Sequence, residues 1–191
     1  MGVLLDDLLL LARLDQGRPL ERVPVDLDLL VTDAVSDARA ADSARRVTAR
    51  IDAPVRVNGD DMRLRQVLGN LLRNALVHTP AGTAIEVRLR RDGASAVIEV
   101  IDHGPGIAHD HAHRIFERFH RSDPGRSRDQ GGSGLGLSIV DAVVTAHGGG
   151  IRVEDTLGGG ATFMIELPAI PAPAPPPMGG EPTPAADPAV A

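Results

Sequence analysis

Apolar residues recur at the three- to four-residue spacing of α-helices in four stretches of the chain. Residues 2–14 are apolar on more than one face and are too short to stand alone, so they need a partner helix. Residues 25–44 form an amphipathic pattern that starts near Asp26 or Asp28. A third pattern begins at Asp60, runs to about residue 78 and stops before Pro80. A fourth, residues 135–147, ends at three glycines. Four helices are therefore expected.

Alternation of apolar with polar residues predicts two β-hairpins. Residues 85–89 and 96–101 flank an Asp-Gly pair, and residues 151–154 and 162–167 flank the glycines at 158–160. Two further short strands, 47–51 and 55–57, surround Pro54.

Two stretches lack such periodicity. Residues 102–134 are rich in Gly, Pro, His, Arg and Asp around one short helical piece, residues 115–119, and a connection of this length is usually functional or disordered. From Pro168 onward, the last 24 residues contain nine of the 15 prolines. Because this segment has almost no large apolar side chain, we expect a disordered tail, with a proline-rich docking peptide as the alternative.

Composition narrows the classes of function. With 191 residues and 42% hydrophobic residues, the chain can form one domain with a sizeable core. The absence of cysteine excludes disulfides and thiolate metal sites. A net charge of -6 and only 2% aromatic residues argue against nucleic-acid binding. No signal peptide or apolar span is apparent, which favours a cytoplasmic location.

Two asparagines stand four residues apart in the third predicted helix. At about 100° per residue, Asn70 and Asn74 project from one side of that helix. An amide oxygen there can coordinate Mg²⁺ that already carries phosphate oxygens. Ordinary polar surface residues are the alternative. The neighbouring apolar arc consists of Leu64, Leu68, Leu71, Leu72 and Ala75.

A carboxylate and two glycines follow the strand at 96–101. In the sequence Asp102-His103-Gly104-Pro105-Gly106-Ile107, the glycines allow the backbone to approach a planar ligand closely. The carboxylate can accept a hydrogen bond from an exocyclic amine such as that of adenine. A tight turn without a ligand is the alternative.

A third motif leads from the long loop into the fourth helix. It reads Gly132-Ser133-Gly134-Leu135-Gly136-Leu137-Ser138. Free backbone N–H groups and the positive end of the helix dipole suit phosphates there. The motif lacks the GKS or GKT ending of a P-loop and follows no strand of a βαβ unit, so neither the Walker nor the Rossmann motif applies. A glycine-rich helix start is the alternative.

Taken in order, these motifs resemble the N, G1, F and G2 boxes of sensor histidine kinases. The F box corresponds to Ile115-Phe116-Glu117-Arg118-Phe119, and GGGATF at 158–163 resembles the G3 box. The resemblance covers roughly residues 1–167. It implies an α/β fold, a two-layer sandwich of the Bergerat type, with a mixed sheet backed by helices and ATP held under a mobile lid.

The resemblance also implies roles for individual residues. Asn74 would bind Mg²⁺, and Asn70 would assist at the metal or the phosphates. Asp102 would recognise the adenine amine beside Gly104 and Gly106. Arg121, Arg126 or Arg128 in the lid would reach the γ-phosphate, with Arg121 counted as catalytic together with both asparagines. The rest of the expected ATP-binding set is His78, Ile107, Phe119, Gly132, Ser133, Gly134, Leu135, Gly136, Leu137 and Thr162.

One position separates kinases from ATPases with the same fold. Relatives that hydrolyse ATP have a Glu four residues before the metal-binding Asn, whereas this chain has Asn70. Because an amide is a poor base for water, the sequence favours phosphoryl transfer from Mg-ATP to a histidine, for signalling to a response regulator. An anti-sigma-type serine kinase, which typically lacks the F box, and a non-catalytic ATP-binding module are the alternatives.

The resemblance divides the chain into four parts. Residues 1–16 resemble the end of the dimerisation and phosphoacceptor hairpin, 17–25 a linker, 26–168 the ATP-binding domain and 169–191 the tail. None of the seven histidines has the context of an acceptor histidine, so phosphorylation in cis is not expected. The acceptor would act in trans or from the N-terminal part of a longer kinase, in which case a membrane anchor in that longer protein is an alternative to a cytoplasmic location. The apolar N-terminal helix would permit a homodimer.

Several positions depart from the family pattern. Val77 stands where Lys or Arg is common, which places more of the triphosphate binding on the lid arginines. His78 and His120 occupy positions often filled by a larger ring. The run His109, His111 and His113 suggests a metal site, but its spacing in a loop without a carboxylate pair argues against one.

Overall fold

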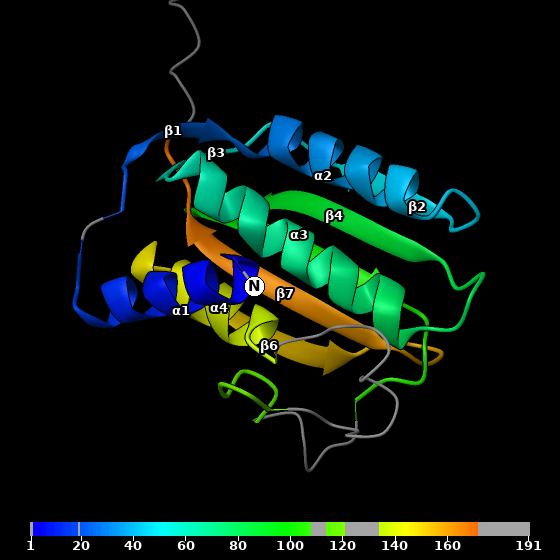
Figure 1. The fold of residues 1–191 in the computed structure, drawn as a ribbon. Coiled ribbons are helices and arrows are strands. Elements are labelled where there is room, and N and C mark those ends of the chain that lie inside the picture. The colour runs from blue at the N-terminus through cyan, green and yellow to red at the C-terminus, as the bar shows by residue number, and fades with distance from the viewer. Residues whose placement is uncertain (1, 19, 108–113, 121–133, 172–191) are drawn as a thin grey trace, which may run out of the picture.

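The computed structural model describes residues 2–18, 20–107, 114–120 and 134–171. These residues form a layer of helices on a mixed β-sheet (Figure 1). In chain order, the elements are α1 (Gly2–Asp15), β1 (Val23–Asp26), α2 (Leu27–Ala41), β2 (Val47–Ile51), β3 (Arg56–Gly59), α3 (Asp61–His78), β4 (Ile85–Asp92), β5 (Ser95–Asp102), α4 (Gly136–Ala146), β6 (Gly150–Asp155) and β7 (Ala161–Pro168).

Five strands form the main sheet in the order β2-β4-β5-β7-β6. The β2–β4 pair is parallel and the other three pairs are antiparallel, so the sheet is mixed as expected. β1 and β3 form a separate antiparallel pair. The register places Asp102, the last residue of β5, opposite Ile85 at the start of β4.

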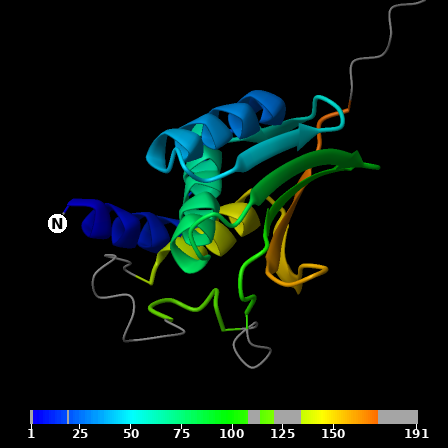
Figure 2. The ribbon, with the colours of Figure 1, turned by 90° about the vertical axis from the view of Figure 1, so that its right-hand side faces the viewer.

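The helices cover one face of the main sheet. In the side view they lie together on one side of the strands (Figure 2). α3 packs between α2 and α4, and α1 lies against α4. The core-facing positions alternate along the strands, as at Val87 and Leu89, and these side chains are fully buried. Each such side chain stabilises the fold by about 1.5–3 kcal/mol. The predicted α/β fold, with a mixed sheet backed by helices, is confirmed.

The chain differs from the sequence-based expectation in its short elements. Residues 23–26, assigned to a linker and to the start of a helix, form β1, and α2 begins only at Leu27. The strands 47–51 and 55–57 lie in different sheets. Residues 114–120 form turns and not the helical piece expected at 115–119.

The chain after β7 is ordered further than expected. The N–H of Ala169 donates to the carbonyl oxygen of Ala94 at 2.8 Å, and the N–H of Ile170 donates to that of Arg56 at 2.7 Å. The disordered tail predicted from residue 169 was therefore wrong for these two residues, and residues 172–191 lie outside the described part. Within that part, no helix combines the length and apolar character that crossing a lipid bilayer requires.

Candidate nucleotide-binding site

Helix α3 presents the two asparagines at the edge of its buried face. Asp60 caps the helix, because its side chain accepts a hydrogen bond from the N–H of Arg63 at 3.1 Å. The predicted apolar arc, with Val67 added, is buried against the sheet and the neighbouring helices. Asn70 and Asn74 are half-buried beside it. The helix thus holds both amides at the surface of the core.

The first asparagine joins α3 to the start of α4. Its amide nitrogen donates a 3.3 Å hydrogen bond to the carbonyl oxygen of Gly136, the first residue of α4. A side chain at position 136 would lie 3.8 Å from the Asn70 Cγ atom. The bond leaves the amide oxygen of Asn70 available as an acceptor. No acidic residue occurs in the first turn of α4, so its helix dipole favours an anion here.

Asp102 is a buried carboxylate at the end of β5, 6% exposed. Its Oδ1 atom accepts hydrogen bonds from the N–H groups of Gly104 at 2.9 Å and Ala161 at 3.3 Å. These two bonds fix the orientation of the carboxylate, and no described residue donates to Oδ2. A buried carboxylate is costly unless its lone pairs are used, which suits Oδ2 to a donor on a ligand.

Glycines allow two chain segments to meet beside this carboxylate. At Gly160 (φ 111°) a Cβ atom would overlap the carbonyl oxygen of Asp102. At Gly106 (φ 77°) a Cβ would lie 3.2 Å from the carbonyl oxygen of Gly160. The segment after β5 and the turn before β7 therefore pack backbone against backbone, and the GGGATF motif is part of the site's framework.

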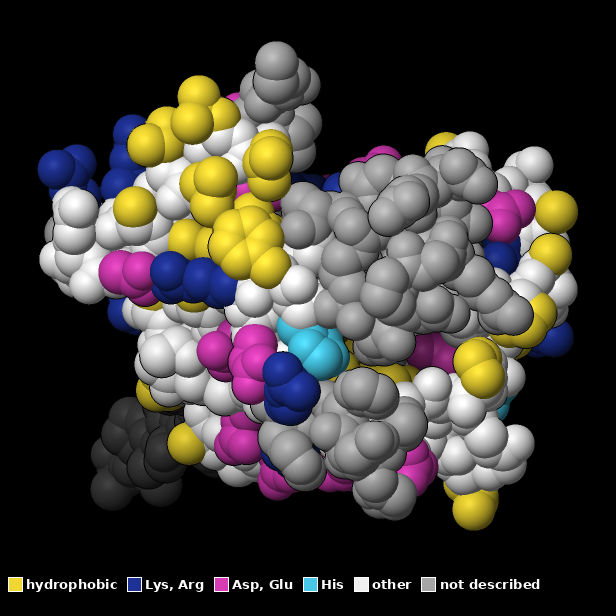
Figure 3. All heavy atoms as spheres, turned by 60° about the horizontal axis from the view of Figure 1, so that its bottom comes forward, with side chains coloured by type: hydrophobic (Ala, Val, Ile, Leu, Met, Phe, Trp, Pro, Cys, Tyr) yellow, Lys and Arg dark blue, Asp and Glu magenta, His cyan; other side chains and the backbone are white. Residues whose placement is uncertain are grey.

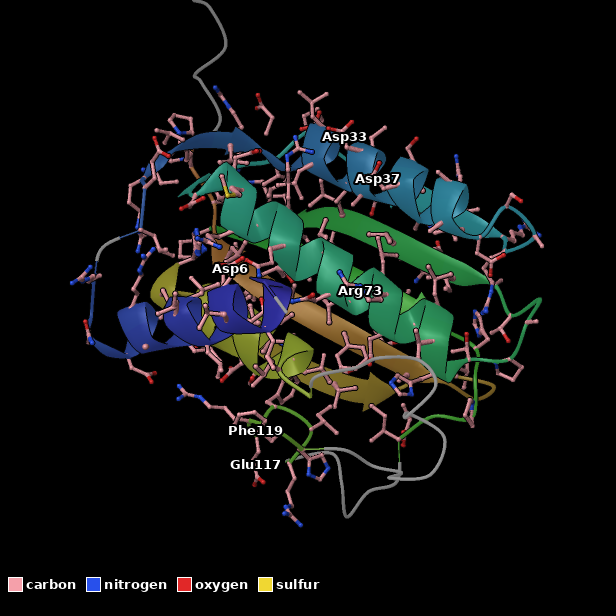
Figure 4. The ribbon with its side chains drawn as sticks, viewed as in Figure 1. Asp6, Asp33, Asp37, Arg73, Glu117 and Phe119 are labelled. Atoms are coloured by element: carbon pink, nitrogen blue, oxygen red, sulfur yellow. The ribbon has the colours of Figure 1, made fainter. Side chains whose placement is uncertain are left out.

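The Phe-containing segment connects α1 with the turn before α4. Phe116 packs edge-on against Phe163, with ring centroids 6.5 Å apart. Phe119 is instead 60% exposed in a left-handed conformation (φ 61°), and its N–H donates to the carbonyl oxygen of Gly134 at 3.0 Å. The guanidinium of Arg118 bonds both carboxylate oxygens of Asp15 at 2.7 Å. Figure 4 shows Phe119 and Glu117 on the segment that lies below α1 and α4 in that view.

Other predicted contact residues differ in how they are placed. Ile107 and Leu137 are half-buried and pack against the core. Leu135 is fully buried, so it can meet a ligand only through its backbone. His78 is exposed at the end of α3.

The structure does not bring Thr162 together with Asp102. Along β7 the core-facing residues are Ala161 and Phe163, so the side chain of Thr162 lies on the opposite face of the sheet. Its hydroxyl is 2.9 Å from that of Thr156. The predicted ATP contact of Thr162 is therefore not supported. Several other predicted residues lie outside the described part of the chain, namely Arg121, Arg126, Arg128, Gly132, Ser133, His109, His111 and His113.

The donor atoms around Asn74 fit a magnesium ion that arrives with phosphates. Asn74 makes no hydrogen bond within the described residues, so its amide oxygen is available. The described residues contain no cluster of three His, Asp or Glu side chains suited to hold a metal unaided. Mg²⁺ keeps several waters and takes few protein ligands when phosphates supply the rest, so Asn74 and the amide oxygen of Asn70 fit such an ion.

Two buried residues beside the site, Arg45 and Thr79, were not predicted from the sequence to lie there. Arg45 donates to the hydroxyl of Thr79 at 2.5 Å, and a Cβ at Gly104 would lie 2.6 Å from the Thr79 methyl carbon. Arginine is ordinarily exposed, so composition gives no sign of such burial. The position of Thr79, directly after a predicted helix, was the only available signal.

A buried histidine fixes the start of α3. His147 is 3% exposed; its Nδ1 lies 2.7 Å from the carbonyl oxygen of Val143, and its Nε2 accepts from the N–H of Asp60 at 3.0 Å. Burial lowers the pKa of His147, although the Val143 carbonyl opposes this. The neutral ring is enclosed and does not present itself as a phosphate acceptor.

Comparison with known proteins places the chain among relatives. Residues 59–171 match the family model described as "Histidine kinase-, DNA gyrase B-, and HSP90-like ATPase". The "Probable sensor histidine kinase TcrY" of Mycobacterium tuberculosis is 50% identical over 166 residues, which cover 86% of this chain and 35% of that protein. SenX3, a sensor-like histidine kinase of the same species, is 43% identical over 176 residues, covering 89% of this chain and 42% of SenX3.

Solved structures agree with this placement. The mycobacterial sensor histidine kinase MprB has a TM-score of 0.70 at 35% identity, covering 79% of this chain and 99% of that one. Full-length ShkA in complex with AMPPNP has a TM-score of 0.77 at 34% identity, covering 90% of this chain and 36% of ShkA. The chain thus spans well under half the length of its curated relatives. It belongs to the histidine kinase-, DNA gyrase B- and HSP90-like ATPase family, as the ATP-binding catalytic domain of a two-component sensor histidine kinase.

Proposed function

We propose that this chain binds Mg-ATP along the C-terminal half of α3 and transfers the γ-phosphate to a histidine of a phosphoacceptor domain. The observation that carries the proposal is that α3 contacts both parts of the site, the glycine turn suited to phosphates and the segment beside the carboxylate suited to adenine. Near Asn70 it contacts Gly136, and near Thr79 it contacts Gly104 beside Asp102. Nine residues separate these points, roughly 13 Å along a helix. A nucleoside triphosphate lying along α3 would meet both.

The adenine end is assigned to Asp102. With Oδ1 held by two backbone N–H groups, Oδ2 is the acceptor for the exocyclic amine of adenine. Guanine presents an oxygen at the equivalent position, which a carboxylate would repel. The site should therefore prefer adenine nucleotides.

The phosphate end is assigned to Asn70, Asn74 and the first turn of α4. The N–H groups of that turn carry the positive end of the helix dipole, and Gly136 brings them against α3. The amide oxygens of Asn74 and Asn70 would hold Mg²⁺, which neutralises phosphate charge when bound. The lid arginines Arg121, Arg126 and Arg128 would complete this end.

Transfer to a strong nucleophile fits the site better than hydrolysis. Asn70 donates its amide N–H to Gly136, and an amide oxygen takes up no proton near neutral pH. From Met62 to His78, α3 contains no carboxylate that could act as the base for water. Positioning and charge neutralisation are then the main contributions of the protein.

An exposed apolar surface is assigned as the binding site for the phosphoacceptor domain. The apolar surface consists of Leu4, Leu5, Leu8, Leu9 and Phe119, which are 39–60% exposed. Figure 3 shows apolar side chains gathered on one face of the molecule, and the Asp15–Arg118 ion pair links α1 to the segment that carries Phe119. A helical phosphoacceptor domain, supplied in trans or by a longer protein, would cover it, with α1 also contributing to a homodimer. The phosphohistidine would then supply a response regulator.

Two variants test the adenine end and the phosphate end of the site separately. In titrations with and without Mg²⁺, Asp102→Ala should weaken ATP, ADP and adenosine alike, because the base contact is lost. Asn74→Ala should lower only the Mg-dependent part of the affinity for ATP. Asp37→Ala in α2 and Asn58→Ala in β3 serve as matched controls, because both side chains are exposed and neither is assigned to the site.

Phosphotransfer is tested with γ-labelled ATP. The label should appear on an added phosphoacceptor domain and not on this chain, and both site variants should slow its appearance. Phosphohistidine retained on this chain would contradict transfer in trans. Wild-type affinities in both site variants would contradict the site itself.

A further inference from the structure

Arg45 is a charged side chain enclosed by protein. It lies in the connection between α2 and β2, and its side chain is 4% exposed. Among the described residues, Arg45 and Asp102 are the only buried members of the Asp, Glu, Lys and Arg classes. Burying a guanidinium is costly unless its donors are used, so its partners indicate its role.

The partners of Arg45 lie at the end of α3. Nη2 donates to the carbonyl oxygens of Leu76 at 3.1 Å and Thr79 at 3.4 Å, and Nη1 donates to the hydroxyl oxygen of Thr79 at 2.5 Å. The remaining donor, Nε, pairs with Oδ2 of Asp42 at 3.3 Å. A cation bonded to the last carbonyls of a helix also interacts favourably with its dipole. Arg45 therefore fixes the helix end that follows Asn74.

Thr79 connects the fixed end of α3 to the segment at Gly104. Its hydroxyl accepts from Arg45 and donates to the carbonyl oxygen of Ala75 at 2.7 Å, so its side chain has one orientation. That orientation directs the methyl group at Gly104, where an added Cβ would lie 2.6 Å from the methyl carbon and 3.0 Å from Oδ1 of Asp102. The N–H of Gly104 donates to that same Oδ1 at 2.9 Å.

We infer that Arg45 is a positioning residue for base recognition, acting through Thr79 and Gly104 on the carboxylate of Asp102. Arg45 does not touch the nucleotide. Arg45 holds Thr79 against Gly104, and this contact orients the Asp102 carboxylate so that Oδ2 faces the exocyclic amine. Loss of Arg45 should therefore reduce selectivity for adenine more than binding of the triphosphate. The inference rests on the proposed function, in which Asp102 accepts from that amine.

The test compares Mg-ATP with Mg-ITP, whose base has a carbonyl oxygen in place of the amine. Arg45→Met should lower the affinity for ATP about tenfold, the effect of losing one well-placed hydrogen bond to a charged group, and leave ITP affinity within about twofold. Arg45→Lys should recover part of the ATP preference, because an ammonium can still bond a carbonyl oxygen. In the kinase assay, the change should appear in KM for ATP and not in kcat.

Thr79→Val provides a second variant if Arg45→Met folds poorly. It retains the methyl group against Gly104 but loses the hydroxyl that Arg45 holds, so the ATP-to-ITP ratio should fall again. Arg39→Met is the matched control, since Arg39 also donates to a backbone carbonyl, that of Val47, at 2.7 Å, but has no link to Gly104. It should lower the melting temperature without changing the ratio.

Asp102→Ala in the same assay distinguishes failure of the inference about Arg45 from failure of the proposed function. If its ATP-to-ITP ratio falls to about one while Arg45→Met and Thr79→Val keep the wild-type ratio, the inference about Arg45 is overturned and the proposed function stands. If Asp102→Ala itself keeps the wild-type ratio, the assignment of Asp102 to adenine fails, and the inference fails with it.

Discussion

The side-chain amide of Asn70 on α3 donates a hydrogen bond to the backbone carbonyl of Gly136, so the asparagine helix and the first residue of α4 are in direct contact. The contact uses the N–H of the amide and leaves its oxygen without a hydrogen-bond partner among the described residues. The phosphate end of the site is in this sense preorganised, which lowers the entropy lost on binding.

Asn70→Asp should disrupt this arrangement. The aspartate loses the donor, places a negative charge near the Gly136 carbonyl, and repels phosphates. ATP affinity in the absence of Mg²⁺ should fall about tenfold or more, while adenosine affinity stays unchanged. Calorimetric titration with both ligands checks this. Equal weakening of adenosine would mean that the substitution disturbs the whole site.

Asp102→Asn should change base preference and not merely reduce binding. The N–H groups of Gly104 and Ala161 will attract the amide oxygen of the new side chain, which directs its NH₂ toward the base. That group repels the adenine amine and can donate to a carbonyl oxygen. The ratio of ATP to ITP affinity should therefore fall to one or below. A variant that keeps a strong ATP preference would contradict the assignment of Oδ2.

Gly160→Ala should be more damaging than Gly158→Ala. Both glycines have positive φ, so alanine costs about 1–3 kcal/mol at either position. Only at Gly160 would the Cβ also overlap the backbone of Asp102, whereas nothing lies within 4 Å at Gly158. We expect the Gly160 variant to melt at least about 5 °C below the Gly158 variant and to lose ATP binding. Similar melting curves for the two would argue against the close packing described.

Stability should fall as the pH drops below the ordinary histidine pKa of about 6.5. Burial lowers the pKa of His147 in the folded state, so between the two pKa values the unfolded chain binds a proton that the folded chain does not. The free energy of unfolding should decrease there by up to about 1.4 kcal/mol per pH unit. Urea unfolding from pH 8 to pH 5 measures the slope, and His147→Gln, which does not titrate, should show a smaller one.

The apolar surface should affect phosphotransfer and not nucleotide binding. Leu5→Ser and Leu9→Ser each remove an exposed apolar contact, so transfer to an added phosphoacceptor domain should slow at least about tenfold at sub-saturating acceptor. ATP affinity should stay within about twofold. Leu157→Ser, on a residue 98% exposed in the β6–β7 turn, is the matched control. Normal transfer by both variants would place the docking surface elsewhere.

The long elements were predictable because each carries its own periodicity. The apolar stripe of α3 and the alternation in β4 and β5 set both the element and the buried face, and the family resemblance implied that Asn70 and Gly136 both lie at the phosphates. The β1–β3 pair was not predictable, since four residues that include Pro24 give no periodic signal and their partner is distant in sequence. The parallel pairing of β2 with β4 is likewise non-local.

Two local errors have identifiable causes. The sequence suggested a short helical piece at residues 115–119, but the positive φ of Phe119 breaks any helix and leaves its side chain 60% exposed. The role of Arg45 depends on Thr79 and Gly104, which lie 34 and 59 residues away, and no local pattern reports such a contact.

The course of the chain after β7 has a practical consequence. Pro168 pairs with Ser95, the first residue of β5, whereas Asp102 is the last, so seven residues, roughly 23 Å of strand, separate them. Ala169 and Ile170 then secure the chain to the segment around β3. A fluorophore or surface tether attached at Pro171 would depart from the far end of the sheet, and immobilised protein should keep its full capacity for ATP.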